Sequence, residues 1–295
     1  MTQGAVGFVG LGVMGEPMCR NLKAKSGRRV VAYDIDPAPL ARLAAHGVEA
    51  LADAAGVAAA ADVVFVSMPS GKVLADLVHA GNGLIGQARA VQVFVDLGTS
   101  PVKLTRALAA EFALRGARFL DAPVARTRAA AEAGTLSVMV GGDAAGFEAV
   151  KPLLACFATE ITHCGALGSG QVTKILNNMV LFETVAALAE ACAIARRSGV
   201  DAKLLLETLS KGSADSFALR NHGLKAIVAR EFPLRAFSVE YALKDLRYAL
   251  ELAEDAGVDA AGAWRVEQLF REAIAKGLGA HYHPVVSRLL EGGAA

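Results

Sequence analysis

The chain has 295 residues, about twice the length of a typical domain, so two domains are expected. Its 30 basic and 29 acidic side chains nearly cancel, which argues against a broad basic surface for nucleic acid or an anionic membrane. Hydrophobic residues make up 54% of the chain, but no uninterrupted apolar run approaches the roughly 18 residues that span a bilayer, so we expect a cytoplasmic protein.

A glycine-rich turn follows the first predicted strand, Ala5 to Val9. Gly10 permits a tight turn, Gly12 lets the backbone approach a pyrophosphate, and Gly15 lets the next helix pack close to the strand. Free amides of that helix then face the anion. The predicted cofactor loop comprises Gly10, Leu11, Gly12, Val13, Met14 and Gly15. It predicts dinucleotide binding; the alternative is a glycine turn without a ligand.

An acidic residue ends the second predicted strand, Arg29 to Tyr33. Asp34 lies nineteen residues after Gly15, near the spacing of about 20 expected for a carboxylate that accepts the ribose hydroxyls. Such a carboxylate repels a 2′-phosphate, which favours NAD over NADP as the cofactor. Arg28 and Arg29 lie at the start of that strand, the wrong end to meet the ribose.

Further strands are predicted at Val63–Met68, Val91–Leu97, Phe119–Leu120 and Ser137–Val140, and helical patterns alternate with them. This alternation predicts a Rossmann-like, doubly wound parallel sheet in an α/β domain of residues 1–164. Ligands bind beyond the carboxyl ends of such strands, where two loops contain proline. We expect Met68, Pro69 and Thr99 to contact the cofactor; the alternative is that each loop is an ordinary helix cap.

The strand pattern ends before a long helical pattern from Gln171 to Arg197, which we expect to be an interdomain helix. Four more helices are predicted, at 202–210, 219–229, 239–256 and 261–276. Residues 165–295 should therefore form a second, all-α domain. The alanine-rich, nearly uncharged face Val180 to Ala195 favours burial against another subunit, and hence a homodimer or homotetramer.

The cysteines and histidines do not predict a metal site. Cys19, Cys156, Cys164 and Cys192 show no paired C-x-x-C spacing, and we expect reduced packing residues. The segment His281–His283 has no acidic or cysteine partner at ligand spacing, and a solvated loop is expected there.

Two polar residues of the long helix are candidates for proton transfer. Lys174 and Asn178 are four residues apart and lie on one helix face. Partial desolvation among apolar neighbours would lower the pKa of Lys174 toward neutrality, and Asn178 would orient the substrate. The alternative is a solvated surface lysine.

Four motifs, taken in order, resemble those of the β-hydroxyacid dehydrogenase family, typified by 3-hydroxyisobutyrate dehydrogenase. They are Gly7–Gly15, Asp121–Val124 with Gly134–Leu136, Gly168–Asn178, and Lys244–Leu246. The resemblance implies that Lys174 is the general acid/base, that Asn178 orients the substrate, and that Lys244 reaches the nicotinamide side. Without it, Lys244 and Asp245 would be interpreted as a surface ion pair.

The substrate loop departs from the family pattern. Where most members have Ser-Gly-Gly, this chain has Ala125, Arg126 and Thr127. A guanidinium offers a planar fork of donors to an anion, so Arg126 is a candidate anion-binding residue, with Thr127 adding a hydroxyl. The alternative is a solvated loop arginine like Arg128. The Arg-Thr pair resembles sulfolactaldehyde reductases, but Leu181 stands where those enzymes supply a serine.

These features together predict an NAD-dependent oxidoreductase that interconverts a short 3-hydroxy acid and its semialdehyde or oxo acid. Its partner is a small acidic substrate, and neither nucleic acid nor a membrane is expected. One alternative is a reductase of a sulfonate-bearing or other small acidic aldehyde, of the sulfolactaldehyde or succinic semialdehyde type. Two further alternatives are a non-catalytic NAD(P)-binding protein and an imine reductase. Imine reductases have another residue in place of the lysine, so Lys174 argues against that activity.

Overall fold

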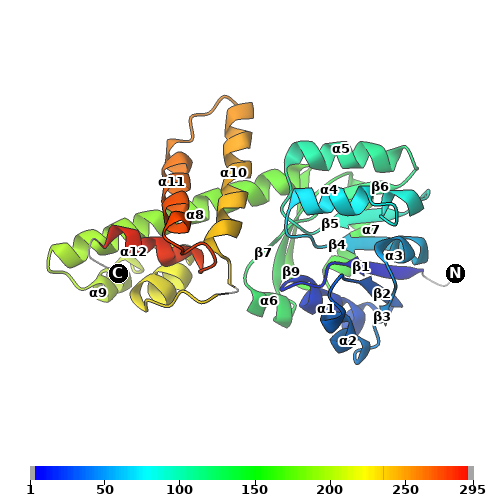
Figure 1. Ribbon diagram of the computed structural model, residues 1–295, viewed down its shortest axis with the longest axis horizontal. Helices are drawn as coiled ribbons and strands as arrows, with labels where there is room; N and C mark the ends of the chain where they lie inside the picture. Colours follow the sequence, from blue (N-terminus) through cyan, green and yellow to red (C-terminus); the bar gives the residue numbers. More distant parts are fainter. Residues whose placement is uncertain (1–3, 235, 292–295) are drawn as a thin grey trace. The chain divides into compact units, whose positions relative to one another are not determined.

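The computed structural model describes residues 4–234 and 236–291. The chain divides into two compact units, Met1–Lys174 and Ile175–Ala295 (Figure 1). The sequence places the domain boundary slightly earlier, ahead of helix α8 (Ser169–Arg197), which begins in the first unit and ends in the second.

One sheet of nine strands is the framework of the N-terminal unit in the described part of the chain. Its order is β3-β2-β1-β4-β5-β6-β8-β7, with β9 paired to β8. The strands are β1 Ala5–Val9, β2 Val30–Tyr33, β3 Glu49–Ala50, β4 Ala61–Val66, β5 Val93–Asp96, β6 Arg118–Asp121, β7 Val124–Ala125, β8 Leu136–Gly141 and β9 Ala158–Gly165. Strands β1 to β6 pair in parallel, which confirms the predicted doubly wound sheet. Strand β8 runs antiparallel to β6 and β7, a reversal that the sequence pattern did not predict.

Helices cover both faces of this sheet. They are α1 Gly15–Ser26, α2 Pro37–Ala44, α3 Ala54–Ala60, α4 Gly71–His79, η1 Ile85–Gln87, α5 Val102–Ala113, α6 Arg128–Ala133 and α7 Ala144–Leu154. Successive strand residues point to opposite faces, so Phe65 packs in the layer of α1, α2 and α7, whereas Val64 packs in the layer of α3, α4 and α5. Each fully buried apolar side chain contributes about 1.5–3 kcal/mol, which is why both faces of these strands are apolar.

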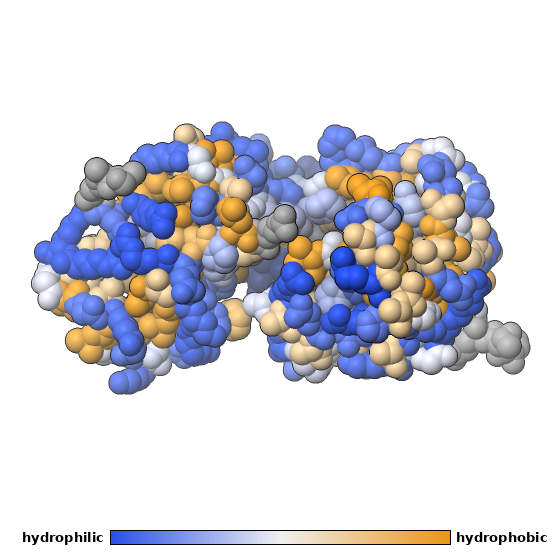
Figure 2. Space-filling view, turned by 60° about the horizontal axis from the view of Figure 1, so that its bottom comes forward, coloured by the Kyte–Doolittle hydropathy of each residue, from blue (hydrophilic) through white to orange (hydrophobic). Residues whose placement is uncertain are grey.

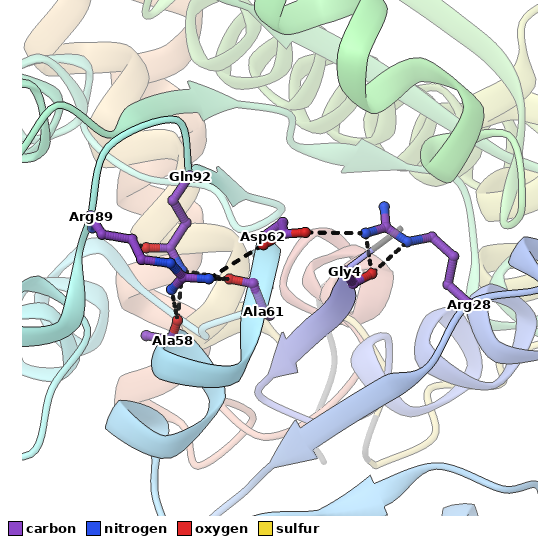
Figure 3. Close-up of polar contacts among 7 residues, drawn as sticks. All are labelled: Gly4, Arg28, Ala58, Ala61, Asp62, Arg89 and Gln92. Carbon is purple, nitrogen blue, oxygen red and sulfur yellow. Dashed lines mark hydrogen bonds and ion pairs between the residues drawn. The ribbon is translucent and has the colours of Figure 1, made fainter. Parts of the chain in front are cut away.

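A polar cluster closes the edge of the sheet where the parallel strands begin (Figure 3). The Arg28 Nε donates to the carbonyl of Gly4 at 2.9 Å, and its Nη2 lies 3.8 Å from the Asp62 carboxylate. Arg89 reaches the same carboxylate at 3.3 Å and donates to carbonyl groups at the end of α3. Arg28 is therefore engaged at the edge opposite the cofactor loop, as its position at the start of the second strand predicted.

The described residues of the C-terminal unit form helices, which confirms the predicted all-α domain. After α8 these are α9 Ala202–Leu209, the π-helix η2 Leu219–Val228, α10 Val239–Asp255, α11 Ala261–Ala275, η3 His283–Val286 and α12 Ser287–Leu290. Among the described helices, α8 is the one long and apolar enough to cross a membrane, but half of its most apolar 18-residue stretch is buried inside the protein. That burial is typical of a core helix.

The expectation of a solvated loop at His281–His283 is wrong. His283 is fully buried in η3, 5.2 Å from Phe182 and 5.3 Å from His222 between ring centroids. The hydroxyl of Tyr282 hydrogen-bonds with Nδ1 of His222. Burial lowers the pKa of His222 to about 4, so both imidazoles are neutral packing groups.

Candidate cofactor and catalytic site

The cofactor loop between β1 and α1 uses each of its glycines differently. Gly10 has φ of 91°, and a Cβ there would lie 2.3 Å from the carbonyl oxygen of Ser67. A Cβ on Gly15 would lie 2.0 Å from the oxygen of Gly10, so this glycine lets α1 approach β1. A Cβ on Gly12 would meet no atom of the described residues within 4 Å. The space beside Gly12 is open to a ligand, as a pyrophosphate contact requires.

Helix α1 begins at the last glycine of the cofactor loop, and the amide of Glu16 donates to the carbonyl of Gly12 at 3.2 Å. The residue at its N-cap is Met14, and it makes no side-chain capping bond. The first amides of an uncapped helix carry a partial positive charge and bind anions. The geometry therefore fits a pyrophosphate, which supplies the acceptors that a Ser or Asp cap would supply elsewhere.

Asp34 lies beside the cofactor loop. Its carboxylate accepts a hydrogen bond from the amide of Leu11 through Oδ2 and another from the amide of Asp36 through Oδ1, at 2.8 Å. Arg29 forms an ion pair with a glutamate of β3 at 2.7 Å. The structure thus brings the predicted ribose acid to the loop and engages Arg29, like Arg28, elsewhere.

The other predicted cofactor residues differ in exposure. Leu11 is buried in the core, whereas the side chain of Val13 is half exposed. Met68 is half-buried, and its terminal methyl lies against Gly10. Pro69 is exposed in the loop that leads to α4.

The two proline-containing loops after β4 and β5 are built differently. Ser70 is the N-cap of α4, and its hydroxyl accepts from the amide of Val73 at 3.3 Å. The N-cap of α5 is Pro101, which makes no side-chain capping bond. Thr99 is buried and does not cap that helix.

A buried carboxylate, the first residue of the motif Asp121–Val124, fixes the start of α8. Asp121 lies at the end of β6 and accepts hydrogen bonds from the amides of Gly168 at 2.7 Å and Gln171 at 2.8 Å. Burial raises the pKa of this carboxyl, and the amide donors oppose that shift. A Cβ on Gly170 would lie 2.2 Å from the carbonyl oxygen of Met139. Gly170 therefore allows α8 to pack closely against the sheet, and Asp121 of β6 caps the start of the helix.

Lys174 lies one turn beyond this cap. It is half-buried and is the last residue of the N-terminal unit. Because the first turn of α8 is tied to the ends of strands, the backbone of Lys174 is held at the edge of the sheet that carries the cofactor loop.

In the C-terminal unit, Asn178 and Lys244 share one carboxylate. Nδ2 of Asn178 donates to Oδ2 of Asp245 at 2.7 Å, and Nζ of Lys244 lies 3.1 Å from Oδ1. Nζ of Lys244 also lies 4.0 Å from the centroid of the Tyr241 ring, a cation–π contact. Asp245 and Asn178 are each 1% exposed. Lys244 and Asp245 do form an ion pair, but the interpretation as a surface pair is wrong, because the side chain of Asp245 on α10 is buried.

In the substrate loop a non-glycine residue, Arg126, adopts a positive φ that usually favours glycine. Ala125 ends β7, and Arg126 has φ of 85°, a conformation that costs a non-glycine residue about 1–2 kcal/mol. Nη1 of Arg126 donates to the carbonyl of Thr135 at 2.6 Å and to the hydroxyl of Thr159 at 3.2 Å. Thr127 is the N-cap of α6, where its hydroxyl accepts from a backbone amide at 3.4 Å.

Cys19, Cys156 and Cys192 are buried, as expected of packing residues, and Cys164 is half-buried; all four are free thiols. Within residues 4–234 and 236–291, no three His, Cys, Asp or Glu side chains are placed to hold a metal ion.

Two family models match successive parts of the chain. The model described as the NAD binding domain of 6-phosphogluconate dehydrogenase matches residues 5–165. The model described as NAD-binding of NADP-dependent 3-hydroxyisobutyrate dehydrogenase matches residues 168–290.

Individual proteins are similar over almost the whole length. The 2-(hydroxymethyl)glutarate dehydrogenase of Eubacterium barkeri is 34% identical over 93% of this chain and 90% of its own. The 2-hydroxy-3-oxopropionate reductase of Escherichia coli is 32% identical over 97% of both chains. A structure of Mycobacterium tuberculosis 3-hydroxyisobutyrate dehydrogenase with L-serine superposes with a TM-score of 0.89 at 30% identity, over 98% of this chain and 100% of that one.

The open space beside Gly12 predicts a selective loss of cofactor binding in Gly12→Val. A Cβ there meets no atom of the described residues within 4 Å, so the melting temperature without cofactor should change little, but the added side chain fills the place of the pyrophosphate. We expect NADH affinity, measured by fluorescence titration, to fall at least about 10-fold, the effect of losing about 1.4 kcal/mol. Gly81→Val, at another open glycine, is the matched control. Unchanged NADH affinity in the Gly12 variant would place the cofactor elsewhere.

Proposed function

Since the chain belongs to the β-hydroxyacid dehydrogenase family, we propose that it is an NAD-dependent oxidoreductase interconverting a short 3-hydroxy acid and its semialdehyde or oxo acid. The observation that carries the proposal is the joint placement, at one edge of the sheet, of an open glycine loop and of the anchored helix turn before Lys174. The names of the relatives, dehydrogenases and reductases of small hydroxy or oxo acids, support the substrate class.

In this proposal Lys174 moves the proton and Asn178 holds the reacting oxygen. NAD, when bound, supplies a hydride acceptor at its nicotinamide. During oxidation the substrate hydroxyl gives its proton to Nζ of Lys174 as the carbinol C–H bond breaks, and in reduction Lys174 returns the proton to the oxygen. The structure commits one N–H of the Asn178 amide to Asp245, and the second N–H is the donor we assign to the substrate oxygen.

For the cofactor we propose NAD, bound by the backbone of Gly10–Gly15 and by Asp34, with further contacts from Met68, Pro69, Thr99 and Lys244. The position of the Asp34 carboxylate beside the cofactor loop supports NAD over NADP, because a 2′-phosphate would meet a like charge there. A ratio of kcat/KM for NADH over NADPH near or below one would contradict this preference.

Lys174→Ala should reduce turnover by roughly 10³-fold, the usual contribution of a positioned general acid/base. NADH affinity should remain nearly unchanged, because the cofactor loop is untouched. Steady-state kinetics with NADH and a panel of short semialdehydes measures the first effect, and fluorescence titration the second. Lys203→Ala, at an exposed lysine of α9 paired with Glu207, is the control. Normal turnover in Lys174→Ala would remove Lys174 from the mechanism.

We propose that the substrate loop Ala125, Arg126 and Thr127 binds the acidic group of the substrate. Among the described residues the guanidinium of Arg126 is bonded through Nη1, so Nε and Nη2 present a free edge of the fork. The same chemistry would accept a carboxylate or a sulfonate, so a reductase of a sulfonate-bearing or other small acidic aldehyde is the second candidate.

Arg126→Ala should raise the KM for acidic substrates about 10- to 100-fold, the equivalent of one lost charge-assisted pair of about 1.5–3 kcal/mol. Arg128→Ala removes a neighbouring arginine that pairs with Glu132 in α6 and serves as the control. Steady-state kinetics on carboxylate and sulfonate aldehydes measures both. If the affinity for every acidic substrate survives in Arg126→Ala, the loop does not bind the anion through this side chain.

We further propose a cytoplasmic homodimer or homotetramer. Val180 and Ile194 on α8 are 57% and 65% exposed, and apolar patches interrupt the hydrophilic surface in Figure 2. Burying such side chains between copies removes apolar surface from water. Multi-angle light scattering should give two or four times the 30.4 kDa chain mass, and cell fractionation should find the protein in the cytosol. The mass of a single chain at micromolar concentration would contradict the association.

The competing class is a non-catalytic NAD(P)-binding protein. A protein that binds NADH yet turns over no acid in a broad screen of hydroxy acids and semialdehydes would favour it. Retention of Lys174 and of the open cofactor loop supports the enzyme instead.

A further inference from the structure

The side-chain amide of Gln171 makes all of its hydrogen bonds with one segment of the chain, residues 96–100. Its side chain is fully buried at the start of α8. Oε1 accepts from the amide of Ser100 at 3.0 Å, and Nε2 donates to the carbonyl of Gly98 at 2.9 Å and to Oδ2 of Asp96 at 3.2 Å. The amide therefore uses both of its donors and its acceptor on the last residue of β5 and the loop that follows it.

The loop itself is held from its other side by Asp96. That carboxylate is buried and accepts from the amide of Gly98 at 2.8 Å and from the hydroxyl of Ser100 at 2.8 Å. Gly98 and Ser100, the two neighbours of Thr99, are each held by both Asp96 and Gln171. Thr99 therefore lies between two residues that are each held by both side chains.

The backbone of Gln171 is tied to a different strand. Its amide donates to Asp121 at the end of β6, so one residue connects the ends of β5 and β6 with the first turn of α8. Lys174 follows three residues later and is a neighbour of Gln171 on the helix surface. Loss of the side-chain hydrogen bonds of Gln171 would therefore allow Lys174 to shift relative to Thr99.

We propose that Gln171 is a positioning residue that sets the distance between the proton-transferring Lys174 and the loop of Thr99. The inference rests on the proposed function, in which Lys174 exchanges the proton and Thr99 contacts the cofactor. Gln171 itself touches neither substrate nor cofactor and acts through the two elements that it joins. Its loss should therefore lower kcat while cofactor affinity is retained.

The first test is Gln171→Met, which keeps length and approximate volume but removes all three side-chain hydrogen bonds. We expect kcat to fall about 10²-fold, as for a small misplacement of reacting groups, while the Kd for NADH changes less than about 3-fold. Thr173→Ala is the matched control, because the exposed Thr173 bonds within its own helix, to the carbonyl of Ser169 at 2.8 Å. Far-UV circular dichroism and the fluorescence of Trp264 check folding.

A second pair of variants keeps the test valid if Gln171→Met does not fold. Gln171→Glu places a carboxylate against Asp96 and should reduce kcat at least as strongly, since two buried like charges repel. Asp96→Asn combined with Gln171→Glu restores one donor and one charge between the two positions, and we expect it to recover at least about 10-fold of the lost kcat. Recovery of folding without recovery of kcat would overturn the positioning role.

The outcomes separate this inference from the proposed function. If Lys174→Ala retains normal turnover, the proposed function fails whatever Gln171 does. If Lys174→Ala abolishes turnover but Gln171→Met has the same kcat as Thr173→Ala, only the positioning role is wrong.

Discussion

The buried carboxylate of Asp121, capping the N-terminus of α8, is the interaction on which the rest of the structure depends. An ionised acid out of water is unfavourable unless amides and a helix dipole stabilise it, and α8 offers both. In return the carboxylate fixes where a 29-residue helix begins. Lys174 and Asn178 both lie on that helix, so its start, from which both residues are counted, is fixed by Asp121 on β6.

The two edges of the sheet differ in how their backbone polar groups are occupied. Where the strands begin, arginines fill the carbonyl acceptors and close the edge. Where the strands end, Gly12 leaves open space and no side chain caps the N-terminus of α1. The ends of β5 and β6 are exceptions at that edge, because Gln171 donates its side-chain amide to Asp96 and its backbone amide to Asp121. The edge is thus rigid around Thr99 and open around Gly12, as expected for a cofactor site with a fixed catalytic group.

Sequence reasoning predicted the features whose causes are local. The cofactor loop, β1 and the helices after residue 200 follow from turn chemistry and apolar periodicity, which neighbouring residues encode. It missed β9 and the reversal of β8, because strand direction depends on pairing with distant segments. It also missed the cap by Asp121, whose partners lie 47 and 50 residues away. His283 looked solvated because its polarity is visible in the sequence, whereas its aromatic surroundings are not.

The central claim, direct hydride exchange between a hydroxy acid and a bound nicotinamide, is tested most directly by isotope transfer. The protein is incubated with NAD and a panel of 3-hydroxy acids that carry deuterium on the carbinol carbon, and the reduced cofactor is analysed by mass spectrometry. The account predicts NADH that carries one deuterium with at least one acid of the panel, and transfer roughly 10³-fold slower by Lys174→Ala. Reduced cofactor without deuterium, or no reduction with any acid while NAD is bound, would contradict it.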